Sequence, residues 1–335
     1  MKTLIYRTLA ALTGLLLLAG TGACIEDGFT TSPSDQPVFA ADTLDLGLIF
    51  TDEPSATSRM VVYNPHSKGL NISHIAITGE AASRFRMNVD GMSGESFSDV
   101  EIRAKDSIFV FVETTLPEHA GNEPKEITAS LDFTTNGVTR SVVLSATGQN
   151  VRRLSGVTFS ESTSLTAERP YQIYDSIVVA PEATLTIPAG TTLHFHDKAM
   201  LIVRGRLVCE GTAEAPVNMC GDRTGNVVGD ISFDIMSNQW TGVFFTEGSK
   251  GNLILHTDIR NTRQGVTADG AELTIVNSRL HNSGGNVLEA YHSRIRALGS
   301  EFAEAGGGLE YLQGGEHEFS GCTFANNYLF TAISG

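Results

Sequence analysis

Eight acidic residues in the C-terminal half of the chain could act as general acids or bases or bind a metal ion. A lyase needs several carboxylates that converge on calcium, together with a base near the sugar. A glycoside hydrolase needs two carboxylates at a defined separation. The candidates are Asp230, Asp234, Asp258, Asp269, Glu289, Glu301, Glu304 and Glu310.

Histidines suggest a second kind of site, because the chain has nine of them and His194-x-His196-Asp197 would place two imidazoles on one face of a strand. No third ligand stands at a suitable spacing, and His256, His281 and His292 share no common offset. We therefore predict surface histidines, no metal site and no cofactor.

The four cysteines, Cys24, Cys209, Cys220 and Cys322, do not form a disulfide framework. Cys209 continues an inward set of residues at period two, whereas Cys220 directly follows the inward Met219. One side chain points in and the other out, so we predict that Cys209 and Cys220 are not bridged.

A repeat of about 22 residues must position these side chains. A short phrase recurs four times between residues 253 and 327, and its closing apolar residue falls at 259, 280, 302 and 324. A fixed period of this length is typical of a solenoid, in which residues at equal offsets stack from coil to coil. We predict two interior ladders: Ile254, Ile275, Ala297 and Phe319, and then Ile259, Leu280, Phe302 and Phe324.

The polar offsets follow the same register. Charges of alternating sign recur eight and two residues before each closing position, and asparagine recurs two residues after it at most coils. The sets are Glu272, Arg294 and Glu316; Asp258, Arg279 and Glu301; and Asn261, Asn282, Glu304 and Asn326. We interpret the first two as solvated charge ladders and the third as turns. Arg279 between Asp258 and Glu301 would neutralise that pair, so we predict no catalytic residues.

The negative net charge of the chain limits the classes of molecule that it is expected to bind. The formal net charge is −15, and removing residues 1–23 with Lys2 and Arg7 would make it −17. No basic patch opposes this field, so nucleic acid and bare anionic lipid are poor partners. Glycans or other envelope proteins are the expected ones.

Residues 1–23 have the pattern of a secretion signal. Lys2 and Arg7 precede an apolar run over residues 9–18, and small residues lead to Cys24. The segment resembles a bacterial lipoprotein signal, which implies lipidation of Cys24 and a flexible tether over 24–37. Thr21 stands where that signal has an aliphatic residue, and cleavage by an ordinary signal peptidase after Ala23 is the alternative.

Residues 38–150 have the pattern of a β-sandwich. Short alternating segments are expected to form strands over 43–47, 58–64, 70–75, 107–112, 129–133 and 139–146. Their order resembles the ASPM/SPD-2/Hydin immunoglobulin-like family. The matching pieces are Leu44-x-Leu46-Gly47, Val62-x-Asn64-Pro65 and the closing run over residues 141–148. This resemblance implies a spacer or interaction module.

Residues 151–335 are expected to form the solenoid, with 151–170 as a polar connector and Tyr171 opening the first coil. The runs over residues 185–195 and 201–212, and Trp240-Thr241-Gly242-Val243, closely resemble right-handed parallel β-helix proteins. Residues 221–239 break the period and are predicted to project as a loop.

The sequence thus predicts an all-β protein with an immunoglobulin-like β-sandwich followed by a right-handed parallel β-helix. We expect an outer-membrane, surface-exposed protein, lipid-anchored at Cys24, that binds or scaffolds. A polysaccharide-active enzyme, either a lyase or a glycoside hydrolase, is the alternative. The repeat still runs where the sequence stops, so the chain either caps poorly or continues in a longer protein.

Overall fold

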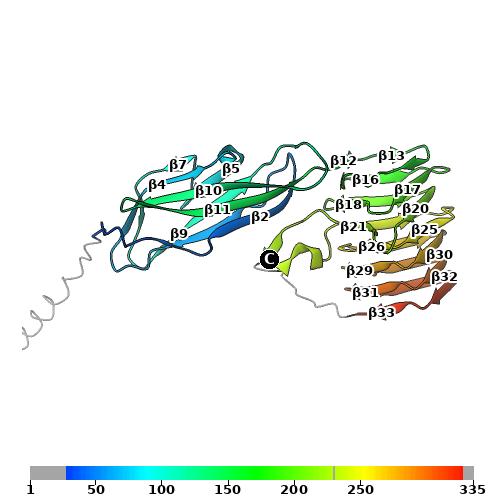
Figure 1. Cartoon of the computed structure of the whole chain (residues 1–335). Helices are drawn as coiled ribbons and strands as arrows, with labels where there is room; N and C mark the ends of the chain where they lie inside the picture. Colours follow the sequence, from blue (N-terminus) through cyan, green and yellow to red (C-terminus); the bar gives the residue numbers. More distant parts are fainter. Residues whose placement is uncertain (1–27, 229–230, 327–335) are drawn as a thin grey trace, which may run out of the picture. The chain divides into compact units, whose positions relative to one another are not determined.

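The computed structural model describes residues 28–228 and 231–326 and is all-β (Figure 1). Its described residues contain two short 3₁₀ turns, η1 (Ala82–Arg84) and η2 (Phe233–Ile235), and no α-helix. None of these residues lies in a helix long and apolar enough to cross a bilayer. The chain forms two compact units; of the described residues, 28–45, 57–113 and 128–144 belong to the first, and 46–56, 114–127, 145–228 and 231–326 belong to the second.

Two largely antiparallel sheets occupy the N-terminal part. One has the order β1 (Val38–Phe39), β3 (Ser58–Tyr63), β9 (Ser107–Thr114), β5 (Phe85–Val89) and β6 (Met92–Gly94). The other has the order β2 (Thr43–Phe50), β11 (Val138–Gln149), β10 (Lys125–Thr135), β4 (Leu70–Thr78) and β7 (Ser96–Phe97), with β8 (Val100–Ile102) also on β4.

Alternating apolar residues bury the inner faces of these sheets. Val62, Val110, Leu131 and Phe133 are fully buried, and the Phe39 and Phe133 rings, one from each sheet, lie 4.8 Å apart. Each of the six segments predicted as strands here coincides with an observed strand. The pattern did not indicate β5 to β8, because they are short and broken by turns such as the one at Asp90 and Gly91.

The C-terminal part is a parallel β-solenoid of about eight coils, and three strands from each full coil define three faces (Figure 1). Its first face has one strand per coil: β12 (Arg152–Ser155), β15 (Tyr171–Tyr174), β18 (Thr192–Phe195), β21 (Val217–Gly221), β26 (Thr257–Ile259), β29 (Arg279–Ser283), β31 (Glu301–Ala305) and β33 (Thr323–Ala325).

The other two faces are joined into one sheet because β30 (Leu288–Leu298) runs through both. The second face continues through β13 (Thr158–Phe159), β16 (Ser176–Val179), β19 (Met200–Val203), β24 (Gly242–Phe245), β27 (Val266–Asp269), β30 and β32 (Glu310–Ser320). The third comprises β14 (Thr163–Ser164), β17 (Thr184–Pro188), β20 (Arg206–Glu210), β25 (Asn252–Leu255) and β28 (Glu272–Val276), and then the second halves of β30 and β32.

The predicted connector over 151–170 is wrong. β12 already pairs in parallel with β15, and Arg152 is in register with Tyr171, so these residues form a first coil. Its strands are only two to four residues long and largely polar, so they show no apolar period from which they could be predicted. Tyr171 lies in the second coil.

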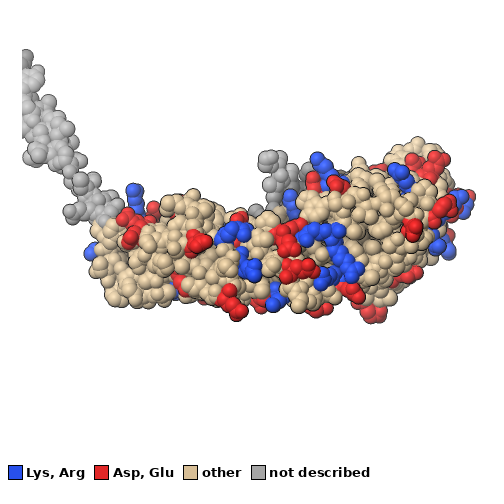
Figure 2. All heavy atoms as spheres, turned by 90° about the horizontal axis from the view of Figure 1, so that it is seen from above, with Lys and Arg blue, Asp and Glu red and all other residues tan. Residues whose placement is uncertain are grey.

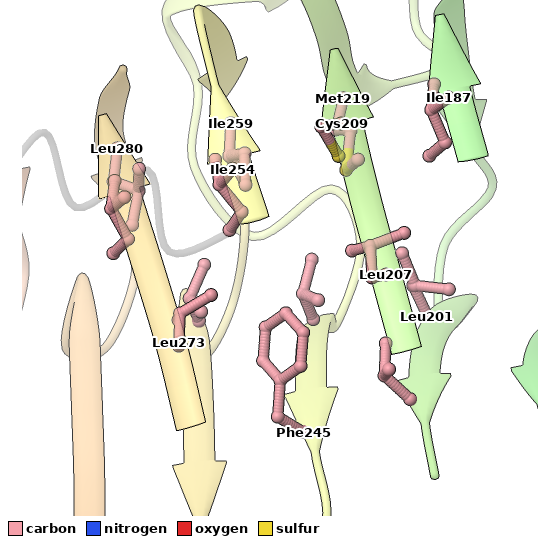
Figure 3. Close-up of a cluster of buried hydrophobic side chains, with 14 of the residues drawn as sticks. Ile187, Leu201, Leu207, Cys209, Met219, Phe245, Ile254, Ile259, Leu273 and Leu280 are labelled. Carbon is pink, nitrogen blue, oxygen red and sulfur yellow. The ribbon is translucent and has the colours of Figure 1, made fainter. Parts of the chain in front are cut away.

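The register of both predicted ladders is confirmed, and their members are buried up to Ala297 and Phe302, whereas Phe319 is half-buried and Phe324 is 41% exposed. Ile254, Ile275, Ala297 and Phe319 are consecutive register partners, as are Ile259, Leu280, Phe302 and Phe324. Figure 3 shows such side chains stacked within the solenoid from Ile187 to Leu280. This burial of apolar surface is the main term that stabilises the stack.

The turn positions also recur as predicted. Asn261, Asn282 and Glu304 all have left-handed backbone angles, with φ of 64°, 54° and 55°. The Asn326 side chain accepts from Ala305 N at 3.1 Å and donates back to Ala305 O at 3.1 Å, satisfying backbone groups of the coil before it. A left-handed turn favours asparagine among non-glycine residues, which explains the repeat.

The segment over 221–239 projects as predicted, with its own short hairpin. β22 (Asn226–Val228) and β23 (Ile231–Ser232) pair in antiparallel fashion, and η2 follows. The chain then returns to the stack at Trp240, which is fully buried.

Candidate functional site

The first face of the solenoid carries a column of polar side chains at the outward position beside the interior ladder. Gln172, His194 and Cys220 are consecutive register partners in this column. Arg260 and His281 occupy the same position in the next two coils, each one residue after an interior partner, Ile259 or Leu280. Each of these five coils therefore contributes one ionisable or polar group to this face, and Ala303 follows in the next coil.

The densest part of this face is a cluster that we call the central cluster: Asp234, Asp258, Arg260, His281 and Glu304. Arg260 donates to Asp258 Oδ1 at 2.8 Å and to Asp234 Oδ1 at 2.8 Å. His281 Nε2 lies 3.3 Å from Asp258 Oδ2, and its Nδ1 lies 3.7 Å from Glu304 Oε2. Three coils and η2 thus contribute to one charged group.

The central cluster favours the ionised form of the Asp258 carboxylate. Burial acts to raise the pKa of Asp258, but the bond from His281 and the charges of His281 and Arg260 outweigh it and lower that pKa. Burial acts to lower the pKa of Arg260, and Cys220, Asp258 and Asp234 reverse this to a net increase. A carboxyl group with a lowered pKa is ionised at neutral pH, so it cannot supply the proton that a general acid must donate there.

We expect Asp258→Asn to destabilise the protein at neutral pH and to lose this effect in acid. A carboxyl group whose pKa is lowered by folding adds stability above the unfolded-state value of about 3.9, and that stability is lost as the pH falls through the folded-state pKa. Denaturant unfolding at pH 7 should show a loss of about 1–2 kcal/mol in the variant, which shrinks toward pH 3.

Glu301→Gln is the matched control, because Glu301 pairs with Arg279 on the same face but is more exposed. Its loss at pH 7 should be smaller than that of Asp258→Asn. A loss in Asp258→Asn that does not change with pH would contradict an ionic role for Asp258.

His281 was predicted to be a surface histidine, and this is wrong. Its side chain is 9% exposed, and no group in the described part of the chain hydrogen-bonds to its Nδ1. The partners of the ring, Asp258 and Glu304, come from the coils before and after it. The sequence could have indicated that His281 lies beside Arg260, because His281 directly follows the interior residue Leu280 just as Arg260 directly follows the interior residue Ile259.

The predicted histidine motif does not converge on one point. His194 Nδ1 lies 3.2 Å from Gly221 O and 3.4 Å from Cys220 Sγ, whereas His196 Nδ1 lies 2.7 Å from Asp222. Asp197 accepts instead from Arg263 at 2.6 Å. Residues 28–228 and 231–326 hold no group of three or more side chains placed to bind a metal.

Cys209 and Cys220 are unbridged, as predicted, and Cys322 is also a free thiol. Cys209 lies in the interior, where burial raises its pKa to about 12. Cys220 points to the outer face but is only 3% exposed. Burial acts to lower the pKa of its neighbour His194, while Cys220, Gly221 and Asp222 raise it to a net increase.

The charge ladders are confirmed, with one change of partner. Arg294 lies 3.6 Å from Glu272 and 3.0 Å from Glu316. Arg279 pairs with Glu301 at 3.2 Å. Asp258 is in register with Arg279, but its ion pairs in the described structure go to Arg260 and His281. Figure 2 shows the two signs interspersed on the surface that it presents.

The remaining predicted residues are dispersed. Asp269, Glu289 and Glu310 lie on the second face, away from the first-face residues Asp258, Glu301 and Glu304. Asp230 and Cys24 lie outside the described residues. The eight acidic candidates therefore do not form a single site; Asp234, Asp258 and Glu304 meet in the central cluster.

Comparisons with known proteins give little further guidance. No family model and no curated protein matches the chain. A family 123 glycoside hydrolase from Clostridium perfringens is 10% identical, with a TM-score of 0.24, over 34% of this chain and 26% of its own. A protein of unknown function from Porphyromonas gingivalis W83 is 12% identical, with a TM-score of 0.25, over 37% and 59%.

The catalytic unit of a GH87 α-1,3-glucanase from Streptomyces thermodiastaticus is 10% identical, with a TM-score of 0.20, over 80% of this chain and 68% of its own. This chain thus spans about a quarter of the Clostridium enzyme and less than two thirds of the Porphyromonas protein. Likenesses at these TM-scores carry no argument about activity.

Proposed function

We propose that this protein binds or scaffolds at the outer surface of a bacterial cell envelope, held there by a lipid on Cys24. In this proposal the tether begins at Cys24 and is shorter than the predicted 24–37, because Thr30 N donates to Gly69 O and Gln36 donates to Thr135 O. The two N-terminal sheets are an immunoglobulin-like spacer. The solenoid, wound in the right-handed sense, is the binding element. The secretion signal and the small residues before Cys24 support the anchor.

The observation that carries the non-catalytic part is the pairing of the carboxylates on the first face of the solenoid. Asp258 is held by Arg260 and His281, and Glu301 is held by Arg279. Glycoside hydrolysis requires two neighbouring carboxyl groups of which one is protonated, and an arginine partner opposes that protonation. Charge pairing of this kind favours a structural role.

We expect Cys24→Ala to abolish lipid attachment. Cells expressing wild type or variant are fed a labelled fatty acid, and their envelopes are fractionated. Wild type should carry label in the outer membrane, and the variant should carry none. Label retained by the variant would place the lipid on another residue, and wild type found free in the periplasm would mean ordinary signal-peptidase cleavage after Ala23. Either result would overturn the anchor at Cys24.

The catalytic alternative is tested on purified protein. Acidic and neutral polysaccharides are incubated with it and assayed for new unsaturated or reducing ends, and no turnover is expected. Turnover that disappears in Asp258→Asn would overturn the non-catalytic function and place a hydrolase or lyase at the central cluster.

A further inference from the structure

The second face of the solenoid carries a patch that the ion-paired ladders do not include. Asp269 on β27, Glu289 and Tyr291 on β30 and Tyr311 on β32 occupy outward positions, because the residues between them, Leu288 and Ala290, are buried. Asp269 is the register partner of Tyr291, and Glu289 is that of Tyr311. We call these four residues the tyrosine patch.

The two rings of the patch form an open corner. The Tyr291 and Tyr311 centroids lie 5.7 Å apart at an interplanar angle of 49°, and Tyr311 is 47% exposed. Tyr291 donates its hydroxyl to Glu289 Oε2 at 3.2 Å, and Asn286 Nδ2 donates to Glu289 Oε1 at 2.7 Å. The carboxylate is therefore fixed beside the rings by neutral donors.

The carboxylates of the patch are not compensated by positive charge. Among the residues that the structure describes, Asp269 and Glu289 form no ion pair with a lysine, arginine or histidine. Across the bend at His292, Arg294 and Arg296 of the same strand pair with Glu272, Glu316 and Glu318. The same strand, β30, therefore carries arginines that are ion-paired and a glutamate, Glu289, that is not. The net charge of the chain is −15.

We propose that the tyrosine patch docks a basic segment of a partner protein, with an arginine or lysine side chain over the tyrosine rings and against Glu289 and Asp269. A cation is attracted to the face of an aromatic ring, and arginine also stacks on it. The uncompensated carboxylates supply charge complementarity and repel acidic partners. The inference rests on the proposed binding function and adds the surface and the chemistry of the partner.

The test measures binding of a fluorescent nona-arginine peptide to the full-length protein in detergent. We expect saturable binding that weakens with salt, and little binding of nona-glutamate. The double variant Tyr291→Ala/Tyr311→Ala should weaken binding about tenfold. Tyr291→Phe/Tyr311→Phe keeps both rings and should lose much less.

A matched pair of charge variants separates the patch from general electrostatics. Asp269→Asn/Glu289→Gln and Glu316→Gln/Glu318→Gln each remove two negative charges, the first from the patch and the second from the paired ladders. We expect only the first to weaken binding about tenfold. Circular dichroism checks that each variant is folded.

Equal effects of the two charge variants, or no effect of the alanine variant, would overturn the proposal. Equally strong binding to phosphatidylcholine vesicles, abolished by the same variants, would assign the patch to a lipid headgroup and overturn a protein partner. Lipid labelling at Cys24 is unaffected by any of these outcomes, so this test and that of the anchor fail independently.

Discussion

Phe302→Asp is expected to lower the free energy of unfolding of the solenoid by about 4 kcal/mol or more. Phe302 is 0% exposed and stacks on Phe324 with ring centroids 5.1 Å apart, and it meets Phe319 edge-on at 5.8 Å. The substitution would bury a carboxylate with no basic partner and leave a cavity in the ladder. Chemical denaturation followed by circular dichroism measures the loss.

Arg279→Ala is the control on the outer side of the same face, one coil before Phe302. Its side chain is about half exposed and pairs with Glu301, so solvent screens the interaction and a loss of about 1 kcal/mol or less is expected. The two variants are compared by their unfolding midpoints, since a repeat array need not unfold in two states. Equal losses would contradict the assignment of inside and outside.

Trp240→Ala is expected to cost about 3–5 kcal/mol, the range for deleting a buried large aromatic side chain. Trp240 is 0% exposed, stacks on Phe195 at a centroid distance of 4.1 Å and 9°, and donates its indole N–H to Arg260 O at 2.7 Å. It also marks the point where the projecting segment returns to the stack. Circular dichroism is again the measurement, because the variant removes the chain's only tryptophan.

Trp240→Phe separates the two contributions of this residue. Phenylalanine keeps much of the stacking on Phe195 but cannot donate to Arg260 O, so we expect an intermediate loss. A Trp240→Ala variant as stable as wild type would mean that the packing of Trp240 against Phe195 does not support the coil.

The interior of the solenoid was predictable because its period is visible in the sequence. Ile254 and Phe302 recur at equal offsets with their partners, and register follows from offset once the coils are stacked. The same argument reached the turn at Asn261, since a left-handed residue must recur wherever each coil bends. The first coil escaped it because Thr163 and its neighbours carry too few apolar residues to show a period.

The ion pairs on the outer face were harder to predict. Which two side chains meet there depends on their length and conformation, and not only on their positions in the repeat. Asp258 faces Arg279 in register yet pairs with Arg260, two residues along its own strand direction. The contact of Arg260 with Asp234 comes from the projecting segment, which has no periodicity to place it. His281 was misjudged for a related reason, since its burial also depends on Asp258 and Glu304, which come from two other coils.

The projecting segment also affects how the solenoid folds, because it lengthens the chain between two neighbouring coils. Ile254 and Ile275 are register partners separated by 21 residues, whereas Cys209 and Ile254 are partners separated by 45. The entropic cost of bringing two points together rises with the logarithm of the chain between them, so this one junction costs roughly 0.6 kcal/mol more than its neighbours to close. Coils before and after it can each grow by adding adjacent turns. The stack thus consists of two locally connected halves whose union is the less local step, although they share one continuous core.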